Sequence, residues 1–118
     1  MMTHRVLIAT ALLMSGAAAH ADYVSGNSLF QNCTSRDATK QIDCLNQIFG
    51  AASGIRIVSD VWELSVLCVP DGVEASQMRD IVVRWLQRHP EKRHYTIGAV
   101  TLSALREAWP CKAARVPQ

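Results

Sequence analysis

The chain has 118 residues, and its 12 Lys and Arg residues against 10 Asp and Glu residues give a formal net charge of +2. This length provides for one domain and excludes large or multi-domain enzymes. So small a net charge lacks the basic footprint of a nucleic-acid-binding protein, and it points to no partner by electrostatics. Composition therefore indicates a small globular protein that binds no nucleic acid.

Residues 1–21 predict a removable export signal. Arg5 precedes an apolar run over residues 6–14, and Ala19-His20-Ala21 matches a signal-peptidase site. The apolar run is about nine residues long, too short to span a bilayer core of roughly 30 Å as a helix. We therefore expect residues 22–118 to form a single helical domain in the periplasm, without membrane insertion. The alternative is a buried N-terminal helix.

The first two predicted helices cover residues 25–33 and 39–64, separated by a polar loop. A Ser-Gly-Asn cluster at residue 25 can cap the first helix. In the second helix, apolar residues recur at spacings of three and four, which predicts one core-facing stripe. The residues of this expected stripe are Ile42, Leu45, Ile48, Phe49 and Ala52.

The periodicity of the second helix becomes unclear in its C-terminal half. Gly50 and Gly54 each cost about 1 kcal/mol of helix stability relative to Ala. Bulky apolar residues occupy most of the positions from 55 to 67, so the pattern marks no single face of the helix. We expect the helix to extend to Trp62, and a short strand over residues 66–69 stays open.

A tight turn at Pro70-Asp71-Gly72 precedes the third predicted helix, residues 76–88. Ser76 is the expected N-cap, and Pro90 ends the helix. The helix carries the clearest amphipathic stripe of the chain. Its apolar positions are Met78, Ile81, Val82, Trp85 and Leu86.

Thr96 is the expected cap of a fourth helix, which ends before Pro110. Its apolar positions are Ile97, Val100, Ala104, Leu105, Ala108 and Trp109. The third and fourth helices are joined by a short connection, so we expect them to pack as an antiparallel hairpin. Trp62, Trp85 and Trp109 lie on apolar stripes and are expected in the core. The predicted fold is all-α, with four to five helices.

All four cysteines follow the predicted signal, which indicates two disulfides formed in an oxidising compartment. A chain reversal between the first two helices brings Cys33 beside Cys44. The return of the chain through the last two helices brings Cys111 close to Cys68. The helix pattern therefore favours the pairs Cys33–Cys44 and Cys68–Cys111.

No catalytic constellation stands out in the sequence. It contains no GxSxG, no HExxH and no glycine-rich phosphate loop. His89 or His94 could serve as a general base with Asp71, or as zinc ligands with cysteines, although the chain has no CxxC pair. Such histidines are more often solvated loop residues. We therefore predict a protein that is not an enzyme and that holds no metal or cofactor.

Several short motifs, taken together, resemble the Tai/Rap immunity family associated with type VI secretion. They are a G-N-x-L opening at Gly26, a C-x-P-x-G-V turn at Cys68, an H-P-E-x-R-H loop at His89, and a terminal A-L-x-x-A-W-P-C ending at Cys111. Their order and spacing cover the chain from Tyr23 to Cys111.

The resemblance implies a small helical periplasmic protein, often a homodimer. Characterised members bind a peptidoglycan amidase delivered by neighbouring cells and occlude its cleft without covalent chemistry. Carried over by position, the partner-binding segment is the loop between the third and fourth helices with the adjoining helix face. Its candidate residues are Arg88, His89, Pro90, Glu91, Lys92, Arg93, His94 and Tyr95. The alternative interpretation of this basic run is a solvated loop tip that contacts no partner.

A second functional class stays open on the sequence alone. The chain could be a structural or assembly protein of the bacterial envelope that has the same fold and no toxin partner. A pulled-down envelope partner, in a strain without such a secretion system, would favour it. A small hydrolase that uses His89 or His94 is a third interpretation, tested by loss of activity on replacing either histidine.

Overall fold

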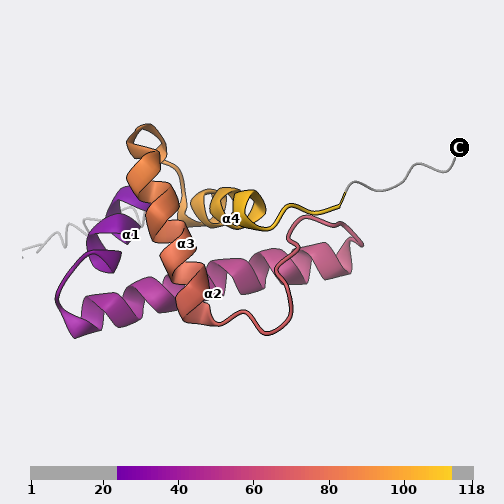
Figure 1. Cartoon of the computed structure of the whole chain (residues 1–118), viewed down its shortest axis with the longest axis horizontal. Helices are drawn as coiled ribbons and strands as arrows, with labels where there is room; N and C mark the ends of the chain where they lie inside the picture. The colour runs from indigo at the N-terminus through magenta and orange to yellow at the C-terminus, as the bar shows by residue number, and fades with distance from the viewer. Residues whose placement is uncertain (1–23, 113–118) are drawn as a thin grey trace, which may run out of the picture.

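The computed structural model describes residues 24–112, so the export signal predicted for residues 1–21 lies outside the described part. Within that part, the chain forms an all-α fold with one short 3-10 turn (Figure 1). The elements are α1 (Gly26–Cys33), α2 (Ala38–Val61), α3 (Ala75–Arg88), η1 (Pro90–Lys92) and α4 (Ile97–Ala108). The possible strand at residues 66–69 is irregular chain instead. No helix among residues 24–112 is long and apolar enough to cross a membrane.

Helix α2 is the platform of the fold. It is 24 residues long, and α1, α3 and α4 all pack against it. Figure 1 shows that α1 lies near one end of α2 and that the other end extends past the shorter helices. The C-terminal end of α2 therefore has fewer neighbours than its middle.

Short polar side chains begin three of the helices. Ser25 Oγ accepts from Ser28 N at the start of α1, and Asp37 Oδ1 accepts from Thr39 N at 2.8 Å at the start of α2. At α4, Thr96 Oγ1 accepts from Ala99 N, as predicted. These bonds satisfy backbone donors that the first turn of a helix leaves without partners.

The start of α3 differs from the prediction, because the N-cap is Glu74 and not Ser76. The Glu74 backbone N–H donates to Gln77 Oε1 at 2.8 Å, so a side chain three residues later closes the first turn. This reciprocal arrangement is the capping box, in which the capping residue is three positions before a Gln or Glu.

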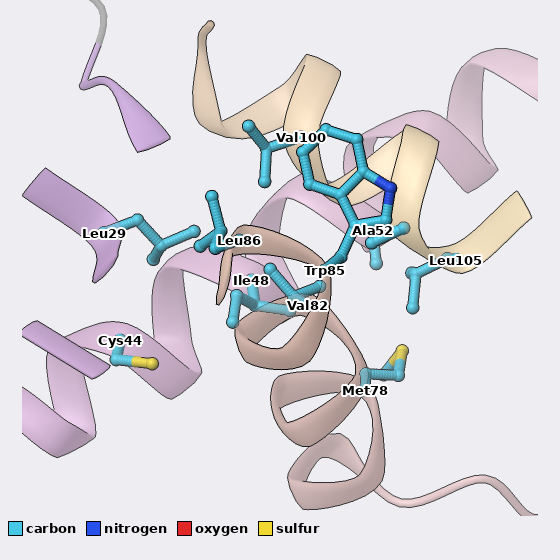
Figure 2. Packing of buried hydrophobic residues seen from close by; sticks show 11 residues of the cluster. Leu29, Cys44, Ile48, Ala52, Met78, Val82, Trp85, Leu86, Val100 and Leu105 are labelled. Atoms are coloured by element: carbon cyan, nitrogen blue, oxygen red, sulfur yellow. The ribbon is translucent and has the colours of Figure 1, made fainter. Parts of the chain in front are cut away.

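The core lies where α3 and α4 meet the middle of α2 (Figure 2). Trp85 of α3 is 3% exposed, and its indole N–H donates to Glu107 of α4 at 3.1 Å. This bond satisfies the one polar atom of an otherwise apolar side chain. The buried hydrophobic residues are Leu29, Cys44, Ile48, Ala52, Met78, Val82, Trp85, Leu86, Val100, Ala104 and Leu105.

The predicted stripe of α2 was wrong at two positions. Ile42 is 58% exposed and Phe49 is 53% exposed. The buried residues of α2 are Cys44, Ile48, Ala52 and Ser59. Because α2 carries apolar side chains on more than one face, spacing alone did not identify the face that the other helices cover.

The disulfides are the two that the sequence favours. Cys33 joins Cys44 and so links α1 to α2, while Cys68 joins Cys111 after α4. The second bond closes the chain around α3 and α4, and its cysteines are 43 positions apart in the sequence. All four cysteines are therefore bonded, and none is free.

Two expectations about packing need correction. Helices α3 and α4 contact each other, but they cross in Figure 1 and do not lie antiparallel, because each also packs on α2. Trp85 is in the core and Trp109 is half-buried, whereas Trp62 is 70% exposed. Trp62 follows the last residue of α2, beyond the reach of the other helices.

Candidate partner-binding site

The predicted partner-binding segment, residues 88–95, connects the end of α3 to α4. Figure 1 shows it at the tip of α3, on the same side of the fold as α1. It contains η1, which begins at Pro90 directly after α3 ends. The segment is therefore compact rather than extended, and its eight residues have very different surroundings.

The backbone of this segment is bonded to the start of α1. Gly26 N–H donates to the Tyr95 carbonyl and Asn27 N–H donates to the Arg93 carbonyl, both at 2.7 Å. Next to them, Ile97 N–H donates to the Val24 carbonyl at 3.0 Å. Helix N-termini carry free backbone donors, and here the loop supplies their acceptors. We call these three bonds the backbone strap.

Gly26 is required for the strap because there is no room for a side chain. A Cβ placed on this residue would lie 2.8 Å from the Arg93 carbonyl oxygen, a backbone atom. It would also lie 3.0 Å from Val100 and 3.2 Å from Leu86. Any other residue would push the loop away from α1, since real Cβ atoms do not approach other atoms so closely.

The Arg93 side chain also holds the loop in place. Its guanidinium lies 3.9 Å from the centre of the Phe30 ring, and its Nε donates to the Leu86 carbonyl at 2.8 Å. A guanidinium over an aromatic face is attracted to the ring, and the added hydrogen bond fixes its plane. Arg93 is half-buried, so it serves the loop more than it faces solvent.

Trp85 anchors the other end of the segment. The His89 ring stacks on the indole with centroids 4.3 Å apart, and His89 Nδ1 lies 2.8 Å from the Trp85 carbonyl oxygen. The Lys92 ammonium lies 5.8 Å from the indole centre. These contacts explain why His89 and Lys92 are half-buried.

The remaining side chains of the segment are exposed. His94 packs edge-on against Tyr95 with ring centroids 4.6 Å apart, and Tyr95 is 41% exposed. Arg88 is exposed and pairs with Glu107 at 3.2 Å. The side chains available to a partner are therefore Arg88, Pro90, Glu91, His94 and Tyr95.

A groove of about 430 Å³ lies beside the loop, between α3 and α4. Arg84 and Arg88 line it from α3, and Glu107 lines it from α4. The groove continues the exposed part of the loop along the adjoining helix face. The family resemblance placed an adjoining helix face beside the partner-binding segment without naming its residues, so that expectation stays a prediction.

Nothing in residues 24–112 assembles a metal site, because no three His, Cys, Asp or Glu side chains come together there. The His89 ring stacks on Trp85, and the His94 ring packs edge-on against Tyr95. The thiols that could have acted as nucleophiles are all in disulfides. What the arrangement offers is a preorganised protein surface with exposed aromatic and charged groups.

In a comparison with protein families, residues 25–111 match the model of the Rap1a immunity proteins. The chain belongs to the Rap1a immunity protein family. No curated protein and no solved structure matches it. The matched range runs from the cap of α1 to the last cysteine, so it contains both disulfides, the backbone strap and the whole of the 88–95 segment.

Membership of the Rap1a family implies immunity to a secreted effector through protein binding, and not catalysis. The sequence predicts the segment as a candidate site, but it does not show the contacts that support the loop. The roles of Gly26 and Phe30 depend on contacts between distant parts of the chain. The G-N-x-L opening was the only signal that residue 26 has a special place.

Proposed function

We propose that this Rap1a family member is a periplasmic immunity protein that binds and occludes a peptidoglycan amidase delivered by type VI secretion. The predicted export signal, the two disulfides and the family match support this location and role. As the family resemblance implies, the proposal includes a homodimer. The effector is a protein partner, and the binding needs no cofactor.

The observation that carries the proposal is the way the 88–95 segment is held. Three backbone bonds, the Arg93 stack on Phe30 and the His89 stack on Trp85 fix the loop before any partner arrives. A loop that is already ordered loses little conformational entropy on binding, which favours tight complexes. A loop with only a solvation role would not need so many supports.

The exposed pair His94 and Tyr95 supplies the anchor that such an interface needs. Tyr residues are enriched among the few side chains that dominate binding energy, and their removal costs 2 kcal/mol or more at the centre of an interface. Arg88 and the groove between α3 and α4 provide the polar surroundings. An interface of roughly 800 Å² per partner would cover this area.

Inhibition of purified type VI amidases tests the proposal. We expect the oxidised protein to bind one amidase of a panel and to stop its hydrolysis of peptidoglycan. The variant Tyr95→Ala should weaken binding by about 30-fold, because a 2 kcal/mol loss corresponds to that factor.

A matched control is Lys40→Ala, which removes an exposed side chain near the start of α2, away from the loop. It should inhibit as the parent protein does. If Tyr95→Ala and His94→Ala together leave amidase inhibition unchanged, the loop is not the binding site. If no amidase is bound and an envelope protein is captured instead, the chain is an assembly protein with the Rap1a fold.

A further inference from the structure

The groove of about 430 Å³ between α3 and α4 carries an excess of positive charge. Arg84 and Arg88 line it from α3, and its one carboxylate is Glu107 of α4. The two arginines lie four positions apart, and like charges at this spacing repel each other and weaken a helix. The pair of arginines is therefore unfavourable for α3 itself.

The Glu107 carboxylate does not neutralise both arginines. Its Oε2 accepts the Trp85 indole N–H at 3.1 Å, and its Oε1 lies 3.2 Å from Arg88 Nη2. No ion pair among the described residues includes Arg84. Its Nε donates to the Asp80 carbonyl oxygen at 3.4 Å, which leaves the two terminal nitrogens available. The positive charge of Arg84 is therefore uncompensated in the groove.

The remaining lining of the groove is apolar and small. Ala104 and Ala108 lie one turn apart on α4, and Ile81 lines the groove from α3. Since alanine extends no further than Cβ, α4 leaves the space beside the two arginines unfilled. Ligand pockets typically have volumes of about 300–1,000 Å³, so this groove has room for a short chain segment. An apolar lining next to two guanidiniums suits side chains that combine an aliphatic stem with a carboxylate.

The distribution of charge along the chain agrees with the charge of the groove. Residues 75–112 contain seven Lys or Arg and three Asp or Glu, whereas residues 24–74 contain three and six, respectively. The small net charge of the chain therefore results from two parts of opposite sign. The positive part includes α4 and the tip of α3, which lie on the same side of α2 in Figure 1. Such a field attracts an acidic partner to this side of the molecule.

We propose that the groove between α3 and α4 binds an acidic segment of the effector, with one carboxylate held between Arg84 and Arg88. A guanidinium can bind a carboxylate through two parallel hydrogen bonds, and such charge-assisted bonds are stronger than neutral ones. The inference rests on the proposed function, in which the partner is a protein, and it adds the chemistry by which that partner is recognised. Because Arg88 both lines the groove and begins the 88–95 segment, the groove and the exposed loop form one continuous surface.

A peptide probe tests the groove without an amidase. The probe is a short acetylated and amidated peptide of alternating Glu and Ala, and the same peptide with Gln in place of Glu is its control. We expect the Glu peptide to shift the backbone amide NMR signals of residues 84–88 and 104–108, and the Gln peptide to leave them unchanged. Arg84→Ala should abolish these shifts.

Arg106→Ala is the matched control for Arg84→Ala. Arg106 is also an exposed arginine, but it lies on α4 and does not line the groove. Like Arg84, it takes part in no ion pair among the described residues. Each substitution removes one positive charge, so a difference between the two variants measures the contact in the groove and not the total charge. Arg106→Ala should preserve the peptide-induced shifts.

Binding to the amidase that the parent protein inhibits is the second measurement. Arg84→Ala should raise the dissociation constant by about 10- to 100-fold, the range expected for losing a hydrogen bond to a charged group. Arg106→Ala should change it by less than about 3-fold, as an exposed charge does. Arg84→Lys should lie between them, because lysine keeps the charge but not the paired bonds.

Three outcomes would overturn the inference. The Glu peptide would leave the groove signals unchanged, or it would shift the signals around Arg106 equally. Arg84→Ala and Arg106→Ala would weaken amidase binding to the same extent. Soluble peptidoglycan fragments would displace the Glu peptide, which would make the groove a site for the cell wall and not for the effector. If the Glu peptide occupies the groove and no amidase binds, the groove keeps its acidic ligand and the amidase of the proposed function is wrong.

Discussion

Gly26 lies where two chain segments approach so closely that only hydrogen fits. Its N–H donates to the Tyr95 carbonyl, and its Cα faces the Arg93 carbonyl oxygen. The residue therefore couples the start of α1 to the loop that carries the proposed binding surface. At this scale, one missing side chain decides whether the loop is held.

Replacing Gly26 with Ala should lower the free energy of unfolding by about 1–3 kcal/mol, the cost of forcing an extra methyl group into a packed site. The Cβ would meet a backbone oxygen at 2.8 Å, which no rotamer change can relieve. Urea unfolding followed by circular dichroism measures the difference. Gly98→Ala is the control, because its Cβ would meet no atom within 4 Å. Equal stability of the two variants would show that the close approach at Gly26 is not needed.

Arg93 and Tyr95 have different roles in the same loop. Arg93 stacks on Phe30 and bonds the Leu86 carbonyl, so it positions the backbone. The Tyr95 side chain is exposed and packs only on its neighbour His94 among the aromatic groups described. The eight residues of the segment are alike in the sequence, because a linear pattern does not separate a supporting side chain from one that faces a partner.

At the scale of the elements, amphipathic pattern predicted α3 and α4 well, because each packs one face on a single core. The end of α3 at Arg88 and the cap of α4 at Thr96 agree with the structure. Helix α2 was harder to predict, since its C-terminal half is apolar both toward the core and toward solvent. The crossing of α3 over α4 was also missed, because it is set by their common contact with α2.

The corrected face of α2 can be tested with two isoleucines of the same helix. Ile48 is fully buried, so Ile48→Ala should cost about 2–5 kcal/mol of unfolding free energy through lost contacts and a residual cavity. Ile42 is mostly exposed, so Ile42→Ala should cost well under 1 kcal/mol. Denaturant midpoints at equal slope give both values. Comparable losses at the two positions would restore the stripe that the sequence predicted.

At the scale of the whole molecule, the disulfides divide the chain into two closed loops. Cys33–Cys44 closes 11 positions and joins neighbouring helices, whereas Cys68–Cys111 closes 43 positions and encloses α3 and α4. The loop-entropy model assigns about 3 kcal/mol to the shorter loop and about 4 kcal/mol to the longer one. These values are large beside the 5–15 kcal/mol net stability of a typical domain.

Removing each disulfide as a pair of Cys→Ala substitutions should therefore destabilise the protein in a definite order. Loss of Cys68–Cys111 should reduce the unfolding free energy by more than loss of Cys33–Cys44, because its loop is longer. Both variants are compared with the oxidised parent by urea unfolding without reductant. The opposite order would show that packing around Cys44, which is fully buried, outweighs the loop entropy.

On the whole molecule, the 88–95 segment is the surface that we propose for an effector, and the C-terminal end of α2 separately exposes Ile57, Val58, Val61 and Trp62. The segment was predicted from a family pattern and stays a prediction, whereas the exposed end of α2 was not expected, because Trp62 was predicted to lie in the core. Apolar residues in a sequence predict burial, but they do not tell whether the same chain or another one provides it. The structure shows which apolar side chains stay exposed among the described residues.

The most direct measurement is survival of cells in which a type VI amidase is exported to the periplasm. Cells that express the full-length chain should remain intact against its cognate amidase. Cells that express residues 22–118 without the predicted signal should lyse, because the inhibitor and the amidase would then be in different compartments. Lysis of cells that contain the exported, disulfide-bonded protein, with every amidase tested, would contradict the account.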